Sequence, residues 1–245
     1  MTKNINQYFN SSLGKIAYKL FKSKQKKECS VIFLHGLGSD QNGTKVAEIL
    51  KHCQSKDYNF LSFDNLGHGE SDGEYQQQTL STWRNAALEL INHLQLDNII
   101  LIGSSKGGWL ALIIALQKIL PIKGVITLAA APDFTKKFID KSLDNPSSEI
   151  TANPPLINKP LIKDSPQYFL LAQKLELNMP LTIIHGLQDD VVPYQTAEKL
   201  FAASINAQPN LILLAASDHR LSSKTDLERI KAEIDLMRTN LFDLS

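Results

Sequence analysis

The feature that most constrains the fold is a regular alternation of short apolar runs with amphipathic helical stretches. The runs are nearly continuous in Val, Ile, Leu and Phe, which is the pattern of strands buried on both faces of a parallel sheet. It predicts strands at 14–21, 31–36, 58–64, 98–104, 122–131, 181–186 and 210–216. Helical spacing predicts helices between or after them at 44–54, 79–95, 107–119, 194–204 and 225–244. We therefore expect an α/β fold whose mostly parallel central sheet is flanked by helices.

The chain length favours one domain, because single α/β domains often reach about 250 residues. The alternation is interrupted at 133–178, which is rich in Pro, Lys and Asn and lacks a strand pattern. A long connection in a compact domain is more often a lid than a formless loop. We expect a single domain over 1–245 with a short inserted cap at 133–178. Apolar cap residues either line an acyl pocket or only pack the cap onto the sheet: Phe134, Phe138, Ile150, Leu156, Ile157, Leu161, Tyr168, Phe169 and Leu170.

Composition and charge argue against several classes of function. The chain has 26 Lys and Arg against 25 Asp and Glu, so no overall field attracts nucleic acid or an anionic membrane. Its longest apolar stretch, at 109–116, is far shorter than the roughly 20 residues of a membrane span, so we expect no stable membrane insertion. The two cysteines have no C-x-x-C spacing. The opening MTKNINQYFNSS resembles neither a signal peptide nor a transit peptide, which predicts a cytoplasmic protein.

Ligands of open α/β sheets bind beyond the carboxyl ends of the strands, and a reactive motif follows the run at 98–104. Gly103-Ser104-Ser105-Lys106-Gly107 reads G-x-S-x-G between a strand and a helix, which is the pattern of a nucleophile elbow. Side chains at Gly103 or Gly107 would collide with the neighbouring strand and helix. Ser105 is the expected nucleophile, and Ser104 is expected to be a small turn residue.

A serine hydroxyl is a weak nucleophile and needs a histidine base that is oriented by an acid. In nucleophile-elbow enzymes the chain order is Ser, acid, His. Asp189 follows the run at 181–186, and His219 follows the run at 210–216. We expect Asp189 to be the acid and His219 to be the base.

Other residues near strand ends remain alternatives. Asp133 could be the acid if the histidine loop approached from the side of the run at 122–131. Asp190 is expected to face solvent. His185, which lies on the acid's own loop, is expected to brace that loop with a hydrogen bond.

Acyl transfer also needs donors aimed at the oxyanion. The backbone N–H of Lys106 follows the nucleophile at a helix N-terminus, and the loop His35-Gly36-Leu37-Gly38-Ser39 can supply the N–H of Leu37. The Lys106 side chain could lie near the site and favour anionic acyl donors, or point into solvent, and the general tendency of lysines favours solvent. This chemistry requires no metal and no organic cofactor.

Together, HGLGS, FDNLGHGES, GSSKGGW, HGLQDDVVP and SDHR resemble the α/β-hydrolase superfamily from Gly14 to the last helix. With NGTK at 42–45, they resemble the α/β-hydrolase domain-containing protein 10 group. The resemblance implies an acyl-protein thioesterase that removes palmitoyl groups from cysteine and also hydrolyses acyl glucuronides, with Ser105, Asp189 and His219 as its triad. The opening segment is not expected to be the mitochondrial presequence that animal members carry, and Lys106 stands where an apolar residue is usual.

The sequence thus predicts a serine hydrolase that cleaves thioesters or carboxylic esters by two-step acyl transfer. Its substrate would be a small molecule or an acylated protein. Two alternatives remain open. A prolyl-aminopeptidase-type peptidase would use the same triad, but it would want a carboxylate-lined cap, whereas this cap carries both signs of charge. A non-catalytic binding module would be expected to have lost a triad member.

Overall fold

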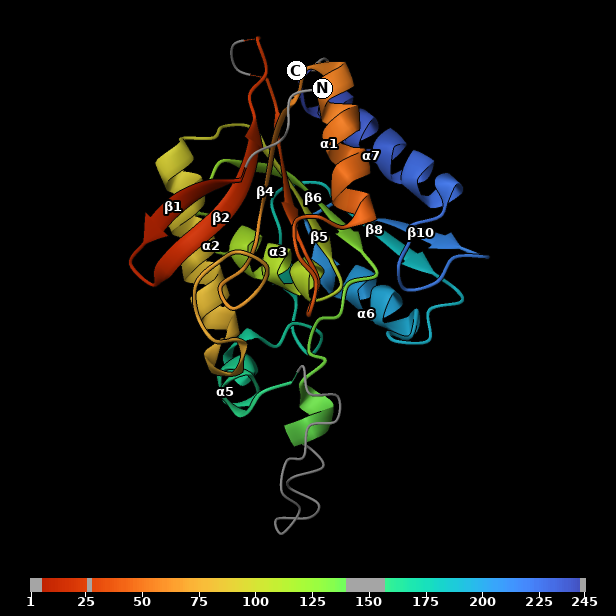
Figure 1. The fold of residues 1–245 in the computed structure, drawn as a ribbon. Coiled ribbons are helices and arrows are strands. Elements are labelled where there is room, and N and C mark those ends of the chain that lie inside the picture. The colour runs from red at the N-terminus through yellow and green to blue at the C-terminus, as the bar shows by residue number, and fades with distance from the viewer. Residues whose placement is uncertain (1–5, 26–27, 140–156, 243–245) are drawn as a thin grey trace.

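The computed structural model describes residues 6–25, 28–139 and 157–242 (Figure 1). Its centre is an eight-stranded sheet in the order β1-β2-β4-β3-β5-β6-β8-β10. Strands β1 and β2 form an antiparallel hairpin, β2 pairs antiparallel with β4, and the six strands from β4 to β10 run parallel. The strands are β1 Gln7–Ser11, β2 Gly14–Phe21, β3 Ser30–Leu34, β4 Asn59–Phe63, β5 Ile99–Ser104, β6 Ile122–Leu128, β8 Leu181–Gly186 and β10 Asn210–Leu214.

Helices cover both faces of the sheet. Helices α1 and α7 lie side by side on one face, where they share a buried cluster with β3, β5 and β6 (Figure 1). Residues of α2, α3, α5 and α6 contribute to the cluster on the other face. The helices are α1 Thr44–Lys56, α2 Leu80–Leu94, α3 Lys106–Leu116, α5 Lys159–Asp164, α6 Gln195–Ala203 and α7 Lys224–Phe242, with short 3-10 turns η1 Tyr75–Gln77 and η2 Ser165–Tyr168.

This arrangement confirms the predicted fold class, and every predicted strand and helix is present. The sequence missed β1 because its residues, QYFNS, are polar and mostly exposed at the edge of the sheet. It also missed a two-residue ladder between β7 (Leu175–Glu176) and β9 (Ser204–Ile205). Burial on both faces produces the continuous apolar signal of the inner strands, and β1, which lies at one edge with most of its residues exposed, lacks it.

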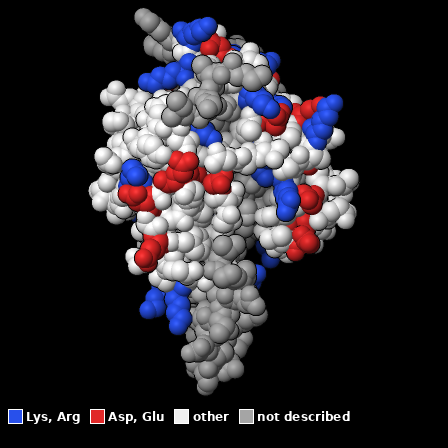
Figure 2. Space-filling view, in the orientation of Figure 1, with Lys and Arg blue, Asp and Glu red and all other residues white. Residues whose placement is uncertain are grey.

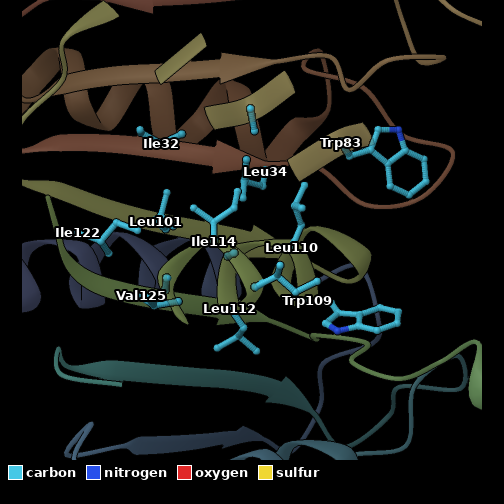
Figure 3. Close-up of a cluster of buried hydrophobic side chains, with 14 of the residues drawn as sticks. Ile32, Leu34, Trp83, Leu101, Trp109, Leu110, Leu112, Ile114, Ile122 and Val125 are labelled. Atoms are coloured by element: carbon cyan, nitrogen blue, oxygen red, sulfur yellow. The ribbon is translucent and has the colours of Figure 1, made fainter. Parts of the chain in front are cut away.

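Helix α3 is the central helix of the fold and begins directly after Ser105. Residues 106–115 are all buried, so this helix is apolar on every side. In Figure 3 its Leu110, Leu112 and Ile114 interleave with side chains from β3, β5 and β6. The same view places Trp83 and Trp109 toward the carboxyl ends of the strands. The start of α3 is therefore held rigidly at the edge where the predicted site lies.

Helix α2 supplies the wall opposite the start of α3. It begins with a capping box, in which the side chain of Thr79 accepts from the Thr82 N–H and the Thr82 hydroxyl accepts from the Thr79 N–H. Trp83 lies in its first turn, fully buried, and donates its indole N–H to the carbonyl of Leu66 at 2.9 Å. The Trp83 ring is therefore fixed by the helix start and by the loop after β4.

The described parts of the expected cap pack against the body of the molecule. Leu161, Tyr168 and Leu170 are buried in the same cluster as α2 and α3, and Trp109 donates its indole N–H to the Tyr168 carbonyl at 2.9 Å. These contacts agree with the packing role weighed for the cap residues. The rest of the expected cap, at 140–156 and including Ile150 and Leu156, lies outside the described residues.

On the face shown in Figure 2, basic and acidic side chains are interspersed among uncharged ones. This distribution suits a chain with a formal net charge of +1. Within the described ranges, none of the helices has the length and apolar content to cross a membrane.

Candidate active site

Ser105 lies at a strained turn between β5 and α3. Its φ of 54° and ψ of −120° lie in a region that residues with a side chain rarely adopt. The turn is held because the Ser105 N–H donates to the Leu128 carbonyl at 2.9 Å. A Cβ at Gly103 would come within 2.2 Å of the Gly107 carbonyl oxygen, and one at Gly107 within 2.1 Å of the Leu34 carbonyl oxygen. The glycines of the motif are thus required sterically, as the sequence predicts.

The structure brings together the three predicted side chains. His219 Nε2 lies 3.1 Å from Ser105 Oγ, and His219 Nδ1 lies 2.8 Å from Asp189 Oδ2. Asp189 and His219 come from loops after the adjacent strands β8 and β10, which explains their proximity. With Nδ1–H donating to the carboxylate, Nε2 is left to accept the serine proton.

Asp189 has a fully buried side chain whose oxygens are all hydrogen-bonded. Its Oδ1 accepts from the backbone N–H groups of Val191 and Val192 at 2.9 and 2.8 Å, and its Oδ2 faces His219. His185 Nε2 lies 3.1 Å from that same Oδ2 and 2.9 Å from the Val192 carbonyl oxygen. Three hydrogen-bond donors therefore hold the carboxylate in place, and His185 braces the loop through the Val192 carbonyl, as expected.

The alternative acid is engaged elsewhere. The two oxygens of Asp133 accept from the N–H groups of Leu170 and Leu171 at 2.8 and 2.9 Å, which ties the start of the cap segment to its end. Burial raises the pKa of the Asp133 carboxyl, against the lowering effect of these amides. Asp190 is exposed, as predicted. The structure thus places Asp189, and not Asp133, beside His219.

A cavity of about 510 Å³ opens at Ser105 and His219, and the loop after β3 forms one of its walls. That loop packs directly on the elbow, since a Cβ at Gly36 would lie 3.4 Å from Ser105 Cβ. Leu37 lines the cavity. Lys106 is the first residue of α3, where backbone N–H groups have no acceptor within the helix. Both predicted oxyanion donors are therefore in elements that border Ser105.

Two buried histidines hold this loop in place, a role that the sequence did not reveal. His35 donates Nδ1–H to the Gly36 carbonyl at 2.8 Å and accepts at Nε2 from the Asn65 N–H at 2.9 Å. His68 Nε2 faces the Gly38 N–H at 3.4 Å. Burial lowers the pKa of His68 to about 4 and that of His35 well below its usual value. Both rings are thus neutral near pH 7, as their acceptor roles require.

The Lys106 side chain corrects the prediction that it points into solvent. The residue is 1% exposed, and its Nζ lies 4.2 Å from the centroid of the Trp83 ring. Burial lowers the pKa of its ammonium to about 7. The general tendency of lysines failed here because the start of α3 is enclosed by α2 and by the loops after β3 and β4.

A second cavity, of about 550 Å³, lies between the cap segment and the loop that carries Asp189. Phe134, Leu171 and Val192 form part of its apolar lining, and Lys136 and Lys199 form part of its polar lining. Within the described part of the chain, no group of three or more His, Cys, Asp or Glu side chains is placed to hold a metal ion.

The sheet order, the elbow serine and the facing His and Asp together define an α/β-hydrolase architecture. The family model described as "alpha/beta hydrolase fold" matches residues 30–161, and the chain belongs to this family. It is 32% identical over 236 residues to "Palmitoyl-protein thioesterase ABHD10, mitochondrial" of Bos taurus, covering 91% of this chain and 76% of the bovine protein. The human protein of the same name is also 32% identical, over 238 residues.

A solved structure of mouse "Alpha/beta hydrolase domain-containing protein 10" superposes with a TM-score of 0.87 at 27% identity, covering 97% of this chain and 99% of that chain. The resemblance seen in the sequence motifs is thus confirmed. The chain is an enzyme of this family, a hydrolase of thioesters or carboxylic esters.

The expected cytoplasmic location is contradicted, because the bovine and human relatives are both named as mitochondrial proteins. The prediction rested on the composition of a short opening segment. Residues 7–11 of that segment form strand β1 of the sheet, so its composition reflects the fold and does not report the location of the protein.

Proposed function

We propose that Ser105 is the nucleophile, His219 the general base and Asp189 the acid of a two-step acyl-transfer reaction. The observation that carries this proposal is the continuous chain of contacts from Ser105 Oγ through His219 to the buried Asp189 carboxylate. A chain in this order lets the imidazole take the serine proton while the carboxylate stabilises the imidazolium that forms.

In the first step Ser105 Oγ attacks the acyl carbonyl as its proton passes to His219 Nε2. The backbone N–H groups of Leu37 and Lys106 stabilise the oxyanion, and each such donor is typically worth about 10²–10³ in rate. The protonated His219 then gives its proton to the departing thiol or alcohol. In the second step water attacks the acyl-enzyme by the same route and releases the carboxylic acid.

We propose long-chain acyl thioesters as the substrate class, carried either by small molecules or by acylated proteins. The relatives named palmitoyl-protein thioesterase support this choice. In this proposal residues 133–178 form a cap within one domain over 1–245. Its described apolar residues shape the cavity through Phe134 and Leu171, while Leu161 and Tyr168 anchor it.

The geometry disfavours the two alternatives. A peptidase that holds a substrate ammonium needs an available carboxylate under the cap. Among the described residues that line the cavity there, the carboxylate is Asp133, and it already accepts two backbone N–H groups. A non-catalytic module has no use for a strained serine aligned with His219 and Asp189, since such strain is costly to maintain.

The test is hydrolysis of matched thioesters and oxygen esters over a series of acyl chain lengths. Thioester cleavage that rises with chain length and disappears in Ser105→Ala would support the proposal. The matched control is Ser104→Ala, which should keep the activity. Preference for short oxygen esters would overturn the substrate class, and activity that survives in Ser105→Ala would overturn the assigned nucleophile.

A further inference from the structure

The Lys106 ammonium is a buried charge that is left without a hydrogen-bond acceptor. Among the described residues its Nζ has no hydrogen-bond partner, and its closest recorded contact is the face of the Trp83 ring. An unpaired buried ammonium is costly, whereas a methionine would fill the same space without that cost. A violation of this kind in a well-packed region points to a functional demand on the charge.

The position of Lys106 indicates what the charge could serve. The backbone N–H of this residue is the proposed oxyanion donor, so its ammonium lies within the reach of one side chain from the oxyanion site. The Trp83 ring that contacts the ammonium also contacts the His68 ring, with centroids 5.5 Å apart, and the His68 ring contacts the His35 ring at 5.0 Å. The charge is therefore linked through packed rings to the two histidines that hold the oxyanion loop.

The groups that face Lys106 leave its charge uncompensated. His35 from the loop after β3 and His68 from the loop after β4 are neutral, and Trp83 from α2 is an uncharged ring. Tyr75 of η1 packs edge-on against His68, and burial raises its pKa to about 12, so it is neutral as well. Burial lowers the pKa of the Lys106 ammonium, and none of these facing groups carries a negative charge that would balance it. In an environment of low dielectric, an unbalanced charge acts over several ångströms.

We propose that the Lys106 ammonium, seated on the Trp83 ring behind the oxyanion loop, is a positioning charge that strengthens oxyanion stabilisation at Ser105. It acts through the field at the elbow and the fixed loop, without touching the substrate. The inference rests on the proposed function of Ser105. The Trp83 face favours the charged form and so opposes the effect of burial.

The experiment compares kcat against pH for the wild type and Lys106→Met, with a thioester as substrate. The wild type should lose kcat as pH rises through about 7, because Lys106 then loses its proton. Lys106→Met should lack this alkaline limb, and its kcat below pH 7 should be lower by about tenfold, less than the loss of a direct oxyanion donor. Lys123→Met, which removes an exposed lysine on β6, is the matched control and should behave as wild type.

A second variant tests the seat of the charge. Trp83→Phe retains an aromatic face but binds cations less strongly, so its alkaline limb should move to lower pH. The proposal is overturned if Lys106→Met has the same pH profile as the wild type or retains full kcat below pH 7. If the wild type hydrolyses no thioester or ester, the proposed function fails and this inference falls with it. If the wild type is active and the two profiles coincide, only this inference fails.

Discussion

Two buried charges flank Ser105, and the protein treats them in opposite ways. Asp189 has a fully buried side chain, but three donors hydrogen-bond to its oxygens. Lys106 is equally buried, yet among the described residues its ammonium has no hydrogen-bond partner and lies against the face of an aromatic ring. The first charge is stabilised by its hydrogen-bond partners, whereas the second has no such partners among the described residues. Burial alone therefore does not reveal whether a charge is stabilised by its surroundings.

We expect the largest effect from removing the hydroxyl of Ser105, the residue that both charges flank. Ser105→Ala should lower kcat by about 10⁶, because the reaction then lacks its nucleophile and base-assisted attack. Steady-state hydrolysis of a thioester measures this loss. The kcat of Ser104→Ala should stay close to that of the wild type. A comparable loss in that variant would contradict the assignment of Ser105 as the nucleophile.

The second prediction concerns Asp189, the buried charge that is held by hydrogen-bond donors. Asp189→Asn should lower kcat by about 10⁴, because an amide fails to hold His219 in the tautomer that leaves Nε2 free to accept a proton. Asp190→Asn is a control at the neighbouring exposed position. Rate measurements on both variants decide the matter, and equal losses would mean that the carboxylate beside His219 is not the acid.

These two predictions concern residues that were readable from the sequence. Ser105 stands in a motif whose glycines are required by close backbone contacts, and Asp189 and His219 lie in the loops after two strands with strong apolar patterns, β8 and β10. The parallel sheet was also predicted from local patterns, the runs of apolar residues in its strands. Strand β1 was missed because its polar residues carry no such pattern.

The environment of Lys106 was not readable in this way. Trp83, His35 and His68 approach it from three separate segments, and no local spacing brings them together. The same holds for Asp133, whose partners Leu170 and Leu171 lie at the far end of the cap segment. Tertiary packing, and not residue type, decided the role of both side chains.

The third prediction concerns Lys106 and its effect on the free energy of unfolding. The folded pKa of Lys106 is about 7, below the roughly 10.4 of a free lysine, so folding is penalised wherever the free amine is protonated. The free energy of unfolding of the wild type should therefore rise by about 3 kcal/mol between pH 7 and pH 10 relative to Lys106→Met. Urea unfolding at both pH values measures the difference. Identical pH dependence in the two proteins would show that folding does not lower the pKa of the Lys106 ammonium.

The smallest expected effect concerns a carboxylate outside the proposed triad. Asp133→Asn replaces a carboxylate that accepts two backbone N–H groups with a side chain that can accept only one of them, which should cost about 1–3 kcal/mol of stability. Turnover per folded molecule should stay close to wild type. Thermal unfolding and kcat together test this, and a loss of kcat like that of Asp189→Asn would restore Asp133 as the acid.

The most direct test of the central claim is intact-mass labelling of the purified protein with a serine-directed fluorophosphonate. We expect one adduct on the wild type and on Ser104→Ala, an adduct that forms more slowly on Asp189→Asn, and no adduct on Ser105→Ala. An unlabelled, well-folded wild type, or an adduct that persists in Ser105→Ala, would contradict the claim that His219 and Asp189 activate Ser105.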